Sequence, residues 1–180
     1  MLLPQQSLDR ARRFLETHAR PLEVARFHCL FAGGRASDVL FELARYQNAD
    51  GGFARALEPD CRGPASSALC TSVAFQILRE IGYTGPSDLT AAAIAWFVRN
   101  CDRGKLSWRL VPYAAEDIPQ APWWNQAAQE KTVEFALNPS AEILGYLYEH
   151  RALVPPELLA ALSERIVAHL AGLSRIIMHD

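Results

Sequence analysis

The chain has 180 residues, of which 50% are hydrophobic and 21% are charged, an ordinary globular composition that can bury a sizeable core. Its formal net charge of −2 gives no overall attraction to nucleic acid or to an anionic membrane surface. No apolar run approaches the length of a membrane span, and the N-terminal residues are too few and too uncharged for a signal peptide. We therefore expect one cytoplasmic domain over residues 1–180, with no membrane span and no nucleic-acid partner.

The apolar residues recur with a helical period along almost the whole chain, and no stretch alternates like a strand. Ser7 is expected to cap a first helix, and Pro21 to open a second that closes at Gly33-Gly34. Pro155-Pro156 opens a last helix. The pattern predicts an all-α fold of antiparallel hairpins, whose middle helices are expected at Ser37–Gln47, Ser66–Ile81, Asp88–Asn100 and Pro139–His150.

A glycine-rich turn separates two of these helices. Gln47 can hydrogen-bond backbone groups at the end of the first helix, and Asn48 and Asp50 favour a turn. Gly51-Gly52 allow a positive φ, and Phe53 is placed to pack its ring on the helix pair. We expect at least one positive φ over 50–52 and a buried Phe53.

The spacing Gln-x-x-x-Gly-x-aromatic, formed here by Gln47, Gly51 and Phe53, resembles the repeat motif of terpene cyclases and protein prenyltransferases. In that α/α-toroid superfamily, such a turn joins an outer helix to an inner one. The resemblance covers residues 36–81 well and extends loosely to residue 151. It implies helical hairpin repeats that form part or all of an α/α toroid. Toroids with other chemistries share the motif, so it indicates fold more strongly than reaction.

The repeat occurs again, at a period of about 50 to 70 residues. A second turn ends on Gly104 and Trp108, and an insertion over 111–135 follows it. Toroids of this kind have about five to seven hairpins, against about three and a half here. We expect a truncated sequence, with completion by another chain or an open arc as alternatives. The last helix should then leave an apolar stripe, covered either by a second copy of the chain in a homodimer or by a natural continuation of the sequence. The stripe is formed by Leu159, Leu162, Ile166 and Leu170.

Acidic and basic residues follow the first glycine turn. The candidate catalytic residues are Asp50, Glu58 and Asp60, with Arg55 and Arg62 as candidate substrate-binding residues. In a toroid this loop can reach the mouth of the central cavity, where acids could protonate an olefin, bind a metal-diphosphate or act on a sugar. The Asp-x-Asp-Asp and Asp-Asp-x-x-Asp motifs of terpene cyclases do not occur in this sequence. In the structural alternative Asp50 shapes the turn, while the other acids pair with the arginines in solvent.

The cofactor is unknown from the sequence, with zinc or magnesium as the candidates. Protein prenyltransferases hold zinc with an aspartate, a cysteine and a histidine, and Asp60, Cys61 and His150 form the corresponding set here. Their spacing is not diagnostic, and no residue is assigned to a metal. Because the cysteines show no CxxC pair, we expect reduced thiols, with disulfides as the less frequent alternative.

Two adjacent tryptophans, Trp123 and Trp124, lie in the insertion and are further candidate substrate-binding residues. Adjacent tryptophans in a loop rarely both find core positions. Their rings could stack on a sugar, line an isoprenoid tunnel or anchor a partner. The structural alternative is that one ring covers the rim of the toroid and the other fills a gap between helices.

The resemblance implies recognition of a hydrophobic small molecule, an isoprenoid in the specific case, by a transferase or cyclase if the protein is an enzyme. One alternative is a carbohydrate-active toroid, a glycoside hydrolase or lyase, with the tryptophans as sugar platforms and Glu58 and Asp60 as the acid pair. The other is a non-catalytic scaffold or oligomerisation domain. An apolar cavity lining favours the first function, a polar groove with exposed rings the second, and a flat centre the third.

Overall fold

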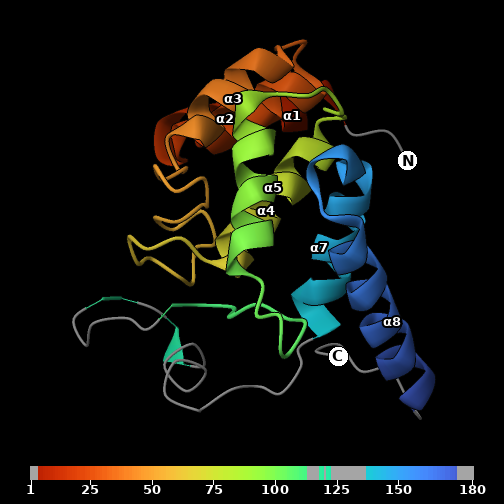
Figure 1. Ribbon diagram of the computed structural model, residues 1–180. Coiled ribbons are helices and arrows are strands. Elements are labelled where there is room, and N and C mark those ends of the chain that lie inside the picture. The colour runs from red at the N-terminus through yellow and green to blue at the C-terminus, as the bar shows by residue number, and fades with distance from the viewer. Residues whose placement is uncertain (1–3, 113–117, 120, 123–136, 174–180) are drawn as a thin grey trace. The chain divides into compact units, whose positions relative to one another are not determined.

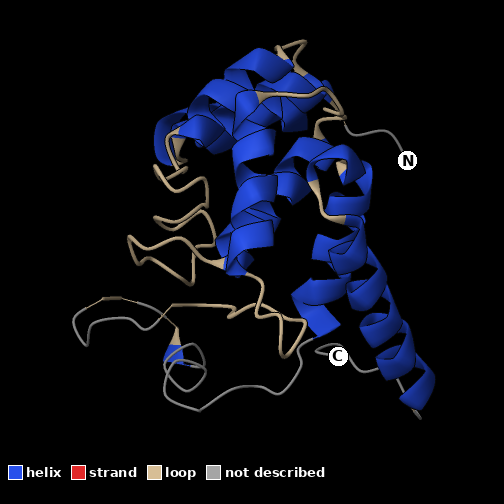
Figure 2. Ribbon diagram, in the orientation of Figure 1, coloured by secondary structure: helices blue, strands red, loops and turns tan. Residues whose placement is uncertain are grey.

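The computed structural model describes residues 4–112, 118–119, 121–122 and 137–173, which are mostly helical (Figure 1). The described residues contain no strand, so the all-α expectation is confirmed (Figure 2). None of their helices combines the length and the apolar character needed to cross a bilayer. The helices are α1 Gln5–His18, α2 Pro21–Phe31, α3 Ala36–Ala44, α4 Ala68–Glu80, α5 Asp88–Asn100, α7 Leu137–Glu149, the 3₁₀ helix η1 Arg151–Leu153, and α8 Pro156–Gly172.

The helix boundaries follow local capping chemistry. The predicted bounds of α5 are confirmed, and Ser87 caps this helix in a reciprocal capping box with Thr90. The prediction that Ser7 caps the first helix is wrong, because α1 begins at Gln5 after Pro4, and Ser7 lies within its first turn. The second helix begins at Pro21, as expected.

The glycine turn includes residues that were expected to belong to the two helices that flank it. Helix α3 ends at Ala44 rather than at Gln47, because the Tyr46 carbonyl accepts from the Ala54 N–H at 3.0 Å. Helix α4 begins at Ala68 rather than at Ser66, because the Ser67 N–H donates to the Phe53 carbonyl at 3.0 Å. The turn is therefore longer, and each helix shorter, than apolar periodicity predicts.

The chain forms two compact units, residues 1–45 with 77–84 and residues 46–76 with 85–180, and each is described by itself. The prediction of one domain over 1–180 stays a prediction. In the first unit α2 packs on both α1 and α3, with Leu22, Val39 and Leu43 fully buried. Arg26 pairs with Glu80 in the same unit.

The second unit has an aromatic centre. The rings of Phe75 on α4 and Tyr146 on α7 stack with centroids 4.7 Å apart, and Phe97 on α5 lies 6.0 Å from Phe75. Trp108 packs edge-on against Phe97 and donates its indole N–H to the Phe97 carbonyl at 2.8 Å. These rings join three helices and the second turn around one core.

Two helices of this core run parallel to each other. Ser72 on α4 donates a hydrogen bond to Glu142 on α7. One turn further along both helices, the ring of Phe75 stacks on the ring of Tyr146. Because the contacts advance in the same direction, α4 and α7 are parallel, as inner helices of successive hairpins would be. The toroid itself stays a prediction.

Helix α8 packs antiparallel to α7 across η1 (Figure 1), and this packing corrects one expectation. The stripe of α8 predicted to be uncovered is buried instead, with exposures of 8% at Leu159, 0% at Leu162 and 5% at Ile166. Leu170, at 42%, is the one member that is exposed. The argument for a homodimer through this stripe therefore fails, because the second unit covers the stripe itself.

Candidate functional site

The glycine turn has the predicted conformation. Gly51 has a φ of +91°, and Phe53 is fully buried. The Phe53 N–H donates to the Thr71 hydroxyl at 3.0 Å, while the Asn48 N–H donates to the Gly52 carbonyl at 2.8 Å. Both expectations for this turn are confirmed.

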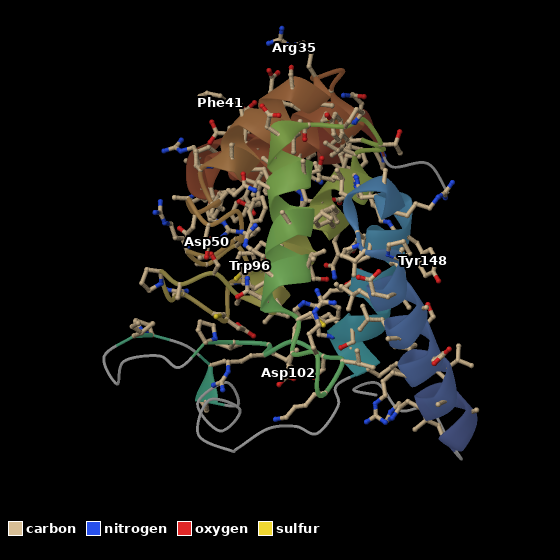
Figure 3. All side chains as sticks on the ribbon, viewed as in Figure 1. Arg35, Phe41, Asp50, Trp96, Asp102 and Tyr148 are labelled. Carbon is tan, nitrogen blue, oxygen red and sulfur yellow. The ribbon has the colours of Figure 1, made fainter. Side chains whose placement is uncertain are left out.

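Asp50 holds the turn against its neighbours with both carboxylate oxygens. Its Oδ1 accepts from the Gly52 N–H at 3.0 Å and from the Ser66 hydroxyl at 2.7 Å. Its Oδ2 accepts from the indole N–H of Trp96 at 3.1 Å, and Asp50 and Trp96 lie side by side in Figure 3. The Asp50 carbonyl also accepts from Arg99. This geometry is that of a residue shaping the turn, and a catalytic role for Asp50 stays a prediction.

Gln47 connects the turn to a helix farther along the chain. Its side-chain amide donates to the Gly51 carbonyl and to the Leu89 carbonyl, both at 2.9 Å. Leu89 lies in the first turn of α5. The sequence predicted backbone partners for Gln47 at the end of the first helix, whereas these two partners lie in the turn and in α5.

The other acids and arginines of the loop are spread over its surface. Asp60, Arg55 and Arg62 are exposed and Glu58 is half-buried. The Arg62 guanidinium donates to the Pro59 carbonyl at 3.2 Å. The Asp60 carbonyl accepts from the Ala121 N–H at 2.9 Å, so the backbone of the loop contacts part of the insertion. Catalytic and binding roles for these four residues stay predictions.

The ligand set imagined for zinc does not assemble. Within the part of the chain that the structure describes, no group of three or more His, Cys, Asp or Glu side chains could hold a metal ion. Asp60, Cys61 and His150 all belong to that part, so they do not form one centre. His150 packs edge-on against the Phe75 ring instead, with centroids 5.8 Å apart.

Cys61 meets Cys70 rather than a metal. Both are buried, with exposures of 3% and 1%. The neighbouring Cys70 side chain, together with burial, raises the pKa of the Cys61 thiol.

A polar cluster on α4 and α7 was not predicted from the sequence. Oε2 of Glu142 accepts from the Ser72 hydroxyl at 2.7 Å and from the Gln76 amide at 2.9 Å. Ser72 is buried, Glu142 half-buried and Gln76 exposed, so the cluster extends from the interior to the surface. The signal in the sequence is a polar residue on the helical face of an aromatic, Ser72 beside Phe75 and Glu142 beside Tyr146.

The first unit carries an apolar groove of about 540 Å³. Phe41 lies at this groove with 70% of its surface exposed, and Figure 3 shows it at the edge of the helices. The remaining apolar lining comes from α2 and from Ala19, the residue that follows α1, and three carboxylates complete the groove. The lining residues are Glu16, Ala19, Pro21, Val24, Ala25, Asp38, Phe41 and Glu42.

The three carboxylates of the groove each have a basic neighbour outside it. A carboxylate oxygen of Glu16 lies 3.1 Å from Nε2 of His28. A carboxylate oxygen of Asp38 lies 2.9 Å from a guanidinium nitrogen of Arg35, and one of Glu42 lies 3.0 Å from a guanidinium nitrogen of Arg45. The hydrogen bond from Arg35 lowers the pKa of Asp38 below its usual value. The carboxylate is therefore ionised at neutral pH, and the groove itself is lined by no basic side chain.

Trp123 and Trp124 lie outside the described residues, so their predicted role in substrate binding stays a prediction. Comparison of the chain with protein-family models, with curated proteins and with solved structures found no match.

Proposed function

We propose that the chain is a toroid protein similar to the prenyltransferases and terpene cyclases, and that it binds a hydrophobic small molecule, with an isoprenoid as the leading ligand class. The turn in which Gln47 and Asp50 hold Gly51-Gly52, and the parallel packing of α4 and α7, support the toroid. The observation that carries the binding function is the apolar groove beside the exposed ring of Phe41.

The groove suits an apolar small molecule. Its volume of about 540 Å³ lies within the range of small-molecule sites, which are lined mainly by apolar side chains with a few polar groups. An exposed phenylalanine supplies a flat apolar surface that gains free energy when a ligand covers it. The groove is lined by three acidic residues and by no basic side chain that could pair with a diphosphate, so we propose a neutral isoprenoid, such as the alcohol.

Titration calorimetry with farnesol tests this function. Phe41→Ala should weaken binding by about tenfold or more, because the ring contributes about 1.5 to 3 kcal/mol when it is fully buried. The matched control is Phe14→Ala, since Phe14 is 62% exposed in the same unit and does not line the groove. Farnesyl diphosphate should bind more weakly than farnesol. Equal affinity of the wild type and Phe41→Ala for farnesol, or no binding by the wild type, would remove the groove as the site.

One observation favours the carbohydrate alternative. The cluster of Ser72, Gln76 and Glu142 presents the amide of exposed Gln76 and the half-buried carboxylate of Glu142, while buried Ser72 holds that carboxylate from the interior. Amides and carboxylates are groups that commonly hydrogen-bond sugar hydroxyls. Titration with a soluble oligosaccharide, with Glu142→Gln as the variant, tests this alternative in the same assay. Oligosaccharide binding that Glu142→Gln abolishes and Phe41→Ala leaves intact would favour the carbohydrate function over the isoprenoid one.

A further inference from the structure

A second pocket of the first unit lies between the first half of α1 and the end of α2, two helices that pack on each other (Figure 1). Its volume is about 210 Å³. Because drug-sized ligands occupy pockets of roughly 300 Å³ or more, this pocket suits a smaller molecule, of the size of a single amino acid. No residue of this pocket lines the groove proposed for the isoprenoid, so the two sites are independent. Its lining includes Gln5, Leu8, Asp9 and Arg12 of α1 and Phe27 and Phe31 of α2.

One wall of the pocket is aromatic. The rings of Phe27 and Phe31 on α2 have centroids 5.4 Å apart and planes inclined by 41°. Phe27 is half-buried, whereas Phe31 is 59% exposed. Leu8 adds an aliphatic side chain from α1. A ligand ring laid against Phe31 removes the apolar surface of both rings from water and forms an aromatic pair with it.

The other wall carries one charge of each sign. A guanidinium nitrogen of Arg12 lies 3.5 Å from Oδ1 of Asp9, against 2.6 Å for the ion pair of Arg20 and Glu23. The side-chain amide of Gln5 donates to the same Oδ1 at 3.2 Å. Among the described residues, Oδ2 of Asp9 accepts no hydrogen bond and the Arg12 guanidinium pairs with no other group. The wall therefore keeps a carboxylate oxygen that can accept from a ligand and guanidinium N–H groups that can donate to it.

We propose that this pocket binds a free aromatic amino acid, with phenylalanine as the representative ligand. The carboxylate of the ligand pairs with the Arg12 guanidinium, which offers two parallel N–H donors. The ammonium group donates to Oδ2 of Asp9, and the ring lies against Phe31. In an amino acid both charged groups are bound to one carbon atom, which matches the close spacing of Asp9 and Arg12. A ligand with only one charge leaves one of these two residues without its partner in the complex, so the pocket selects the zwitterion.

NMR titration of the isotope-labelled protein with L-phenylalanine tests the proposal, because backbone amide shifts report both the affinity and the place of binding. We expect saturable shifts at Asp9, Arg12 and Phe31, and none at Val24 or Phe41 of the groove. Two analogues isolate the charges, since phenylpropionate lacks the ammonium group and phenylethylamine lacks the carboxylate. Each analogue should bind at least about tenfold more weakly than phenylalanine, because it loses one charge-assisted interaction.

Variants assign the three contacts. Arg12→Gln, Asp9→Asn and Phe31→Ala should each weaken phenylalanine binding by about tenfold or more. Arg13→Gln is the matched control for charge, because Arg13 is exposed on the same helix and does not line the pocket. Phe14→Ala is the control for the ring, because Phe14 is 62% exposed and also lies outside the pocket. Asp9→Asn should also remove the preference for phenylalanine over phenylpropionate, since only phenylalanine has an ammonium group to lose its partner.

Three results would overturn the proposal. They are the absence of saturable shifts at the pocket at millimolar phenylalanine, equal affinity of the wild type for phenylalanine and phenylpropionate, and a loss of binding in Arg13→Gln as large as in Arg12→Gln. The farnesol titration of the groove uses a different ligand and a different variant, Phe41→Ala. Failure of one site is therefore distinguishable from failure of the other.

Discussion

Phe53 shows how a single side chain fixes the glycine turn. Its ring is fully buried, its N–H donates to Thr71 and its carbonyl accepts from Ser67, so both its side chain and its backbone are anchored at the start of α4. An aromatic placed directly after two glycines thus converts a conformationally free segment into a fixed one. Removal of the ring should therefore lower the free energy of unfolding as much as removal of a core side chain does.

We expect Phe53→Ala to lower the free energy of unfolding by about 3 to 5 kcal/mol, as for other buried aromatics. Urea denaturation followed by circular dichroism measures this change. Phe14→Ala is the control, since Phe14 is 62% exposed and its removal should cost far less. A melting temperature unchanged by Phe53→Ala would show that the ring does not pack the turn.

The two glycines of the turn are required for different reasons. A side chain at Gly51 would face a φ of +91° and place its Cβ 2.5 Å from the Ala92 carbonyl oxygen. A Cβ at Gly52 would lie 2.5 Å from the Cβ of Ser66 and 2.6 Å from the Trp96 indole nitrogen. The sequence alone predicts the positive φ, because that requirement is local. It cannot predict the close approach of Ser66 and Trp96, because those neighbours come from elsewhere in the fold.

At the scale of helices, Gln47 makes the turn before α4 dependent on α5. Its amide bonds to the carbonyls of Gly51 and Leu89 are each worth about 0.5 to 1.5 kcal/mol. Gln47→Ala should therefore lower the free energy of unfolding by about 1 to 3 kcal/mol. Chemical denaturation measures this change beside Gln76→Ala, which removes one bond from an exposed glutamine. Equal stability of the two variants would contradict a linking role for Gln47.

Helix existence could be predicted better than helix contacts. The bounds of Asp88–Asn100 could be predicted residue for residue, because a serine before a helix, here Ser87, is a local capping signal. The hydrogen bond between Ser72 and Glu142 could not be predicted, because the two residues are 70 positions apart. No local sequence pattern indicates that α4 and α7 pack parallel to each other. The candidate groove was missed for a similar reason. It is formed by side chains from three helices, none of which carries a motif of its own.

For the whole molecule, the burial of the α8 stripe changes the expected oligomeric state. Leu159, Leu162 and Ile166 are covered within the second unit, and the exposed apolar residues Val167 and Leu170 form a small surface of the kind found on monomers. We expect a monomer at micromolar concentration, measured by light scattering. A dimer that Val167→Asp dissociates would contradict this and would place the interface on the exposed side of α8.

The two hydrogen bonds from the Gln47 amide to the carbonyls of Gly51 and Leu89 also determine which segment of the chain can be grafted into another protein. A segment cut from this chain at the end of α4 would carry the glutamine without the carbonyl that its amide reaches in α5. A transplantable module therefore has to include the first turn of the following helix. A chimera that joins the turn to a foreign helix would need a backbone carbonyl within reach of the Gln47 amide at the position of Leu89, and this requirement can be written directly into a design.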